Sequence, residues 1–221
     1  RRFAKGNGDI VTSYIHGGGR IGVIIAAKGT NNDAAKEALT NIAMQVAAMN
    51  PQYISRNDIS EEELAKIKDI TTDSALNDAT TLPKPILNKL LDKAINEKLW
   101  SEDDIQQFEE HKNNMNYVWN FLSDAAKAKL GELAMADKES IVAEKMFAGV
   151  VDGRVSKQLK EICLLEQTYV KAQDGKQSGA KYLESVSKDI VITEMVRFEV
   201  GEGLEKKNED FAAEVAAQAG M

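Results

Sequence analysis

Residues 8–23 of the chain are Gly8-Asp9-Ile10-Val11-Thr12-Ser13-Tyr14-Ile15-His16-Gly17-Gly18-Gly19-Arg20-Ile21-Gly22-Val23. This stretch predicts a β-hairpin with strands at 9–15 and 20–27 and a turn at the glycine run. Glycine adopts the positive φ angles that a hairpin turn requires. The second strand is apolar on both faces and is therefore expected to be buried. Its alternating residues are Ile21, Val23 and Ile25 on one face and Gly22, Ile24 and Ala26 on the other.

A helix and a third strand are predicted to complete the core. Thr30 or Asn32 can cap the helix, and Pro51 stops it. Its apolar residues recur at helical spacing: Leu39, Ile42, Ala43, Val46 and Ala47. Residues 190–200 predict a strand with Ile192, Val196, Phe198 and Val200 on one face and Arg197 and Glu199 on the other. We expect an α+β fold, in which helices cover a small three-stranded antiparallel sheet.

The middle of the chain is predicted to be helical and charged. Ser60 with Glu63 forms a candidate capping box, and Ser101 begins another capped helix. Apolar residues at alternating three- and four-residue steps then predict a short heptad seam: Ile105, Phe108, Met115, Trp119, Leu122 and Ala126. The pattern favours a seam inside a helical hairpin over an exposed dimer surface. Helix is predicted again at 141–148 and 153–162.

These elements predict three parts. The core subdomain comprises residues 1–60 and 141–203. A long helical-hairpin or coiled-coil-like insertion occupies 61–140, and a C-terminal helical module occupies 204–221.

Composition narrows the classes of function. The 221 residues carry a net charge of -7, which argues against broad binding to nucleic acid or anionic membranes. One cysteine, Cys163, permits no internal disulfide, fits a reducing cytoplasm and is expected to be buried. No apolar run approaches the roughly 20 residues of a transmembrane helix, and no signal peptide is visible. The chain begins without methionine, as expected of a fragment.

No motif for catalysis, a metal or a cofactor is found. The histidines, His16 and His111, belong to no metal-ligand pattern. The glycine run is a weak phosphate-loop signal, because a strand follows it instead of a helix N-terminus. His16 allows two interpretations: it is a partly exposed hairpin residue that bonds a nearby backbone group, or it contacts a partner. The apolar face of the terminal helix can likewise pack on its own core or enter a partner's groove.

Three stretches together resemble elongation factor Ts, a factor of translation elongation. They are residues 8–23, residues 43–51 (Ala43-Met44-Gln45-Val46-Ala47-Ala48-Met49-Asn50-Pro51) and residues 196–218, which begin Val196-Arg197-Phe198-Glu199-Val200-Gly201-Glu202-Gly203. They occur in the family's order. The resemblance covers about residues 1–60 and 140–221. It implies a non-enzymatic guanine nucleotide exchange factor that binds elongation factor Tu, disturbs its magnesium and phosphate site, and releases GDP. The residues implied to face this partner are His16, Gly17, Gly18, Gly19 and Arg20, together with Phe211, Ala212 and Val215.

The chain also departs from the family. The resemblance implies an N-terminal helical domain and a core half carrying Thr-Asp-Phe-Val, and this sequence contains neither. The expected function is therefore binding of elongation factor Tu with impaired exchange of GDP for GTP. No direct contact with nucleic acid or membrane is expected. The alternative is a structural helical module without exchange activity, which could form a homodimer through the insertion.

Overall fold

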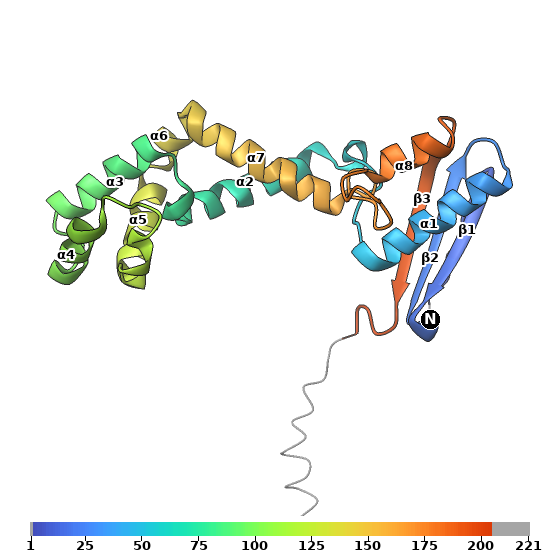
Figure 1. The fold of residues 1–221 in the computed structure, drawn as a ribbon, viewed down its shortest axis with the longest axis horizontal. Coiled ribbons are helices and arrows are strands. Elements are labelled where there is room, and N and C mark those ends of the chain that lie inside the picture. Colours follow the sequence, from blue (N-terminus) through green and yellow to red (C-terminus); the bar gives the residue numbers. More distant parts are fainter. Residues whose placement is uncertain (1, 205–221) are drawn as a thin grey trace, which may run out of the picture. The chain divides into compact units, whose positions relative to one another are not determined.

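The computed structural model describes residues 2–204 (Figure 1). Internal contacts divide the chain into two compact units. The first unit holds the chain up to Asn50 and again from Thr168 onward, and the second holds Pro51–Gln167. The limits expected from the sequence, at 1–60 with 141–203, 61–140 and 204–221, fall at other residues and remain a proposal about domains. The predicted C-terminal helix lies outside the described residues beyond Leu204.

The first unit is built on a three-stranded antiparallel sheet. Its strands are β1 (Ile10–His16), β2 (Ile21–Lys28) and β3 (Val191–Glu199), in the order β1-β2-β3. The hairpin pairs β1 with β2, and β3 returns from the far end of the chain to pair with β2 (Figure 1). The α+β class and the three-stranded sheet predicted from the sequence are thus confirmed.

Two helices accompany this sheet. Helix α1 (Asp33–Met49) packs on β1 and β2, as Figure 1 shows. The Asn32 side chain accepts a hydrogen bond from the amide of Ala35 at 2.8 Å, so Asn32 is the cap. Helix α8 (Gly179–Val186) touches α1 and was not predicted, because eight residues are too short for a helical period to stand out.

The two faces of the sheet differ in burial. Ile10, Val23 and Ile25 are fully buried on the face that α1 covers. On the opposite face, Val11 and Ile15 are 46% and 66% exposed. The N-terminal segment approaches this open face closely at Gly6. A Cβ there would lie 2.8 Å from Val11 Cγ1 and 2.9 Å from Ile24 Cγ2, so the approach requires glycine.

A β-bulge in β3 changes which of its residues lie on each face of the sheet. Ala26 pairs with Glu194, but Ala27 pairs with Ile192, so β3 carries one extra residue at this point. Such a residue reverses the alternation that follows it. Ile192 therefore shares the covered face with Ala27, whereas Val196 and Phe198 lie on the open face. The prediction that Ile192, Val196, Phe198 and Val200 share one face is wrong, and Val200 lies beyond the strand.

The second unit is helical throughout its regular elements. Helix α2 (Glu61–Asn77) packs along α7 (Lys145–Ile162), and α3 (Lys84–Asn96) packs on α5 (Asp124–Ala136). The remaining helices are α4 (Glu102–His111) and α6 (Lys138–Ala143). The N-caps at Ser60 and Ser101 are confirmed, since their hydroxyls accept from the amides of Glu63 and Asp104. For Ser60 this is one of the two hydrogen bonds of the predicted capping box. Cys163 is fully buried, as expected.

Two predictions within this unit are wrong. The heptad seam at 105–126 is not one helix, because α4 ends at His111 and α5 starts at Asp124. Its side chains nevertheless join one core: Phe108, Leu122 and Ala126 are buried, and Ile105, Met115 and Trp119 pack against them. The gap predicted between 148 and 153 is also absent. Helix α7 continues through Gly149 and Gly153, because packing on α2 overrides their weak helix propensity.

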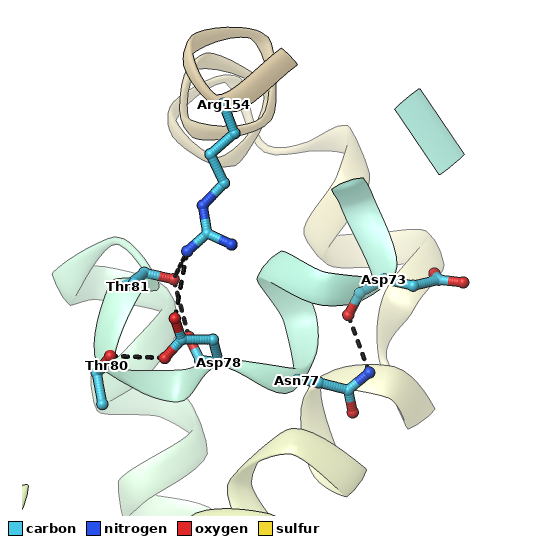
Figure 2. A network of polar contacts seen from close by, with 6 residues as sticks. All are labelled: Asp73, Asn77, Asp78, Thr80, Thr81 and Arg154. Carbon is cyan, nitrogen blue, oxygen red and sulfur yellow. Dashed lines mark hydrogen bonds and ion pairs between the residues drawn. The ribbon is translucent and has the colours of Figure 1, made fainter. Parts of the chain in front are cut away.

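A polar network joins α7 to the end of α2 (Figure 2). Arg154 on α7 donates to Thr81 Oγ1 and to Asp78 Oδ2. The hydroxyl of Thr80 donates to the same Asp78 carboxylate at 2.6 Å. One guanidinium thus ties together the residues at which the chain leaves α2, and this helps to fix the path into α3.

Candidate functional site at the hairpin end

The turn of the hairpin is formed by three glycines with left-handed backbone. The φ angles of Gly17, Gly18 and Gly19 are 60°, 65° and 95°, a region that other residues rarely adopt. A Cβ added to Gly18 or Gly19 would meet nothing within 4 Å. The glycines are therefore required by backbone conformation, and they leave an unobstructed tip where another backbone can approach.

His16 is the last residue of β1 and is held by a neighbour on its own strand. Its Nδ1 lies 3.0 Å from the hydroxyl of Tyr14, and the two rings tilt together with centroids 5.8 Å apart. Residues two apart on a strand share a face, so both rings lie on the α1 side of the sheet. The imidazole is exposed, and the bond from Tyr14 orients it without covering it.

Strand pairing places residues of β2 and β3 beside Tyr14 and His16 on the same face of the sheet. Val23 pairs with Tyr14 on one side and with Arg197 on the other, while Ile21 pairs with His16 and Glu199. Arg197 donates to the Glu199 carboxylate at 2.9 Å. The Arg197 side chain is only 13% exposed, and its Nε is buried without a hydrogen-bond partner among the described residues.

Backbone pairing fixes the far side of the turn. The amide of Val200 donates to the carbonyl of Arg20 at 2.9 Å, so pairing continues past the end of β3. Arg2 forms an ion pair with Glu202 at 2.7 Å and lies 4.6 Å from the centre of the Phe198 ring. The hairpin end thus gathers polar groups from three separate parts of the chain, with Arg2 over Phe198 on the open face and His16 on the face that α1 covers.

The structure brings together five of the predicted site residues. His16, Gly17, Gly18, Gly19 and Arg20 form one continuous exposed turn. The other three, Phe211, Ala212 and Val215, lie outside the described residues. The sequence interpretation missed Tyr14, Arg197 and Glu199 as neighbours of His16. Period-two alternation could have placed Tyr14 beside His16, but only the register of β3 could add the other two.

The chemistry of the hairpin end suits recognition. It presents an imidazole, a guanidinium, a carboxylate and free glycine backbone, which donate and accept hydrogen bonds across a protein interface. Within residues 2–204, no three His, Cys, Asp or Glu side chains are placed to hold a metal ion. None of the helices in this part of the chain is long and apolar enough to cross a membrane.

Comparisons with known proteins agree on one family. The model of the family described as Elongation factor TS matches residues 1–202. Elongation factor Ts of Clostridioides difficile is 36% identical over 223 residues, which are 99% of this chain and 53% of that protein. Elongation factor Ts of Hahella chejuensis is 33% identical over 218 residues, covering 99% and 52%. The chain spans about half the length of the curated relatives it matches.

Proposed function

We propose that this chain, which belongs to the elongation factor Ts family, binds elongation factor Tu and promotes exchange of its GDP for GTP. The observation that carries the proposal is the agreement between the family match and the hairpin end. The match spans residues 1–202 and includes the exposed turn at His16. This turn is the region that the resemblance assigns to the partner.

Exchange of this kind requires binding energy alone. If a protein binds the nucleotide-free partner more tightly than the GDP-bound partner, it weakens GDP by the same factor. Each 1.4 kcal/mol of preference corresponds to about tenfold in GDP affinity. A surface that fits the distorted, nucleotide-free state is sufficient, so no catalytic side chain is needed.

The geometry suggests how the hairpin end takes part. The hydroxyl of Tyr14 engages His16 Nδ1, which leaves Nε2 for a group on the partner. Orienting the ring before binding lowers the entropy lost at the interface. The open space at Gly18 and Gly19 allows the partner's backbone to come within hydrogen-bonding distance of the turn.

We expect the 221 residues alone to accelerate GDP release weakly. The resemblance places a Thr-Asp-Phe-Val motif near the magnesium site of elongation factor Tu, and this sequence contains no such motif. The chain then holds the partner without the residues that disturb magnesium. Binding and exchange should therefore separate in this polypeptide.

Two measurements on the same preparation test this. Calorimetric titration should show tighter binding to nucleotide-free than to GDP-bound elongation factor Tu. Stopped-flow release of a fluorescent GDP analogue should then show a modest acceleration, compared with the full-length factor from Clostridioides difficile as the positive control. Absence of binding to nucleotide-free partner would refute the proposal. Acceleration equal to that by the full-length factor would refute the separation of binding from exchange.

The alternative of a dimerisation module receives less support. It depended on the apolar seam of the insertion, and Phe108, Leu122 and Ala126 of that seam are buried in the core of their own unit. Side chains already buried in this way cannot form a dimer surface. Sedimentation equilibrium should show a monomer at micromolar concentration, and a dimer would restore the alternative.

A further inference from the structure

A hollow in the first unit gathers positive charge, although the chain as a whole is acidic. It has a volume of about 790 Å³ and is open to solvent on one side. Its charged lining comprises three lysines, Lys171, Lys176 and Lys181, and one carboxylate, Asp174. The net charge of the chain is -7, so the charge of this lining is opposite in sign to that of the chain as a whole.

The carboxylate in the hollow, that of Asp174, accepts hydrogen bonds from the loop that carries it. One oxygen of Asp174 accepts from the backbone amides of Lys176 and Gln177, both at 2.9 Å. These hydrogen bonds lower the pKa of Asp174 and close a turn at Gly175, whose φ is 62°. Asp174 thus shapes the loop and stays ionised, with Lys181 near enough to interact with its charge. The three ammonium groups exceed this one carboxylate, so the lining is net positive.

The loop is fixed to the core at its beginning. The fully buried side chain of Gln45 donates to the Thr168 carbonyl at 3.0 Å and accepts from the Val170 amide at 2.7 Å. Between them, the Tyr169 ring is buried and stacks on Tyr182 with centroids 4.0 Å apart. One wall of the hollow is therefore set by core packing.

Hydrogen bonds connect this wall to Lys171, one of the three lysines. Asn41 on α1 donates to the Tyr182 hydroxyl at 2.8 Å, and the ammonium of Lys171 donates to Asn41 Oδ1 at 2.7 Å. Lys171 is thus held at the wall by a chain of contacts that begins in the core. Holding one cation in place reduces the entropy that ligand binding must overcome.

We propose that this hollow binds a phosphate-bearing anion that carries more than one negative charge. Lysines act as separate point charges and suit phosphate oxygens, whereas planar bidentate recognition of either a carboxylate or a phosphate is the property of arginine. The lining contains no arginine. The side-chain amides of Gln173 and Gln177 supply uncharged donors, and the volume admits more than a single phosphate group. The site is separate from the hairpin end and does not depend on the proposed partner.

The test is an amide NMR titration of the whole chain with sodium pyrophosphate at constant ionic strength. We expect saturable shifts confined to the 168–178 loop and the start of α8. In the variant K171Q/K176Q/K181Q, affinity should fall at least tenfold. The matched control, K84Q/K93Q/K157Q, changes the net charge equally at exposed lysines of the other unit and should bind like the parent.

Two further ligands identify the source of the phosphate and its competitor. Tighter binding of uridine diphosphate than of pyrophosphate would assign the stacked tyrosines to a nucleotide base, and equal binding would assign the site to the phosphates alone. Equal binding of hexaglutamate would overturn the assignment to phosphate. Absence of saturable shifts, or equal loss in the two triple variants, would overturn the site itself. Because all six lysines are exposed, thermal melts should be nearly unchanged.

Discussion

Replacing Asp104 with alanine should destabilise the second unit by about 3–4 kcal/mol, because hydrogen bonds to a charged group contribute about 1.5–3 kcal/mol each and are not fully additive. The carboxylate is 6% exposed and links two helix starts. It accepts from the hydroxyl of Ser101 at 2.7 Å, and from the amide and hydroxyl of Ser123 at 2.8 and 2.9 Å. Ser101 caps α4 and Ser123 caps α5, so one side chain orients both caps.

Two substitutions of Asp104 should lower the free energy of unfolding by different amounts. Asp104→Ala removes all three bonds and leaves the Ser123 amide without its acceptor. Asp104→Asn keeps one acceptor oxygen and should cost about 1–2 kcal/mol, the value of one or two ordinary hydrogen bonds. The control is Asp103→Ala, whose side chain is exposed in the same first turn of α4. It should cost only about 0.3–1 kcal/mol through the helix dipole.

Tryptophan fluorescence during urea unfolding is the assay. Both tryptophans of the chain, Trp100 and Trp119, lie in the second unit, so the signal reports that unit alone. Trp100 is buried and donates to the Ala126 carbonyl at 3.0 Å, close to the Ser123 cap. A loss of less than about 1 kcal/mol for Asp104→Ala, no larger than that for Asp103→Ala, would refute the reasoning.

The dependence on pH provides an independent check. Burial alone would raise the pKa of Asp104, but hydrogen bonds from Ser101 and Ser123 outweigh it and hold the pKa below its usual value of 3.8. The ionised form is thus stabilised by folding. Its contribution is complete above the unfolded pKa and is lost as the pH falls through the folded pKa. The advantage of the parent over Asp104→Asn should be constant above pH 5 and should shrink below about pH 4.

Three further predictions concern the first unit and the C-terminal residues. His16→Ala should weaken association with elongation factor Tu by about 1–3 kcal/mol, the cost of leaving a buried partner group unpaired, and should leave the melting curve unchanged. His111→Ala is the control, and equal affinity for the parent and for His16→Ala would return His16 to a local role. Asp189→Asn should lower the melting temperature at pH 7, because hydrogen bonds from Ser187 and Thr30 lower the pKa of Asp189 to about 2. In calorimetric scans the difference in melting temperature from the parent should persist above pH 4 and vanish as the pH approaches 2. A difference that stays constant with pH would contradict this. Deleting residues 204–221 should weaken partner binding by about 2–4 kcal/mol, as hot-spot truncations do, and more than it lowers stability; unchanged affinity with a collapsed melt would assign the segment to the core.

The hairpin and α1 could be predicted because their signals are local. A glycine run needs a positive φ wherever it turns, and Asn32 can cap a helix whatever packs on it. The gap predicted between 148 and 153 is absent because helix propensity is only a weak prior, and the packing of α7 on α2 that overrides it is not visible in sequence. The seam at 105–126 failed in a different way. Its residues do share one core, but the apolar period continued across a turn between two helices.

The bulge in β3 shows why the site itself was only half predictable. Arg197 and Glu199 were correctly placed on one face, but alternation counted from Ile192 put Ile192 on the opposite face. One extra residue between Ala26 and Ala27 of the partner register turns Arg197 inward, beside Val23 and in the same row as Tyr14. No local signal marks the insertion, because it is a property of the pairing between strands about 165 residues apart.

Arg197 also shows that stability is not the only constraint on this row. An unpaired buried polar group costs about 1–3 kcal/mol, and Arg197 Nε is such a group within the described residues. The neighbouring rows of the covered face hold Ile25 and Ile10, which are fully buried, so the same position could hold an aliphatic side chain. Polar residues follow this face from Thr12, which pairs with Ile25 and whose Oγ1 is also buried without a partner among the described residues. They continue through Tyr14 and His16 to the open glycine turn. A cost retained beside the proposed binding surface is the pattern expected where recognition, rather than packing, determines the residue.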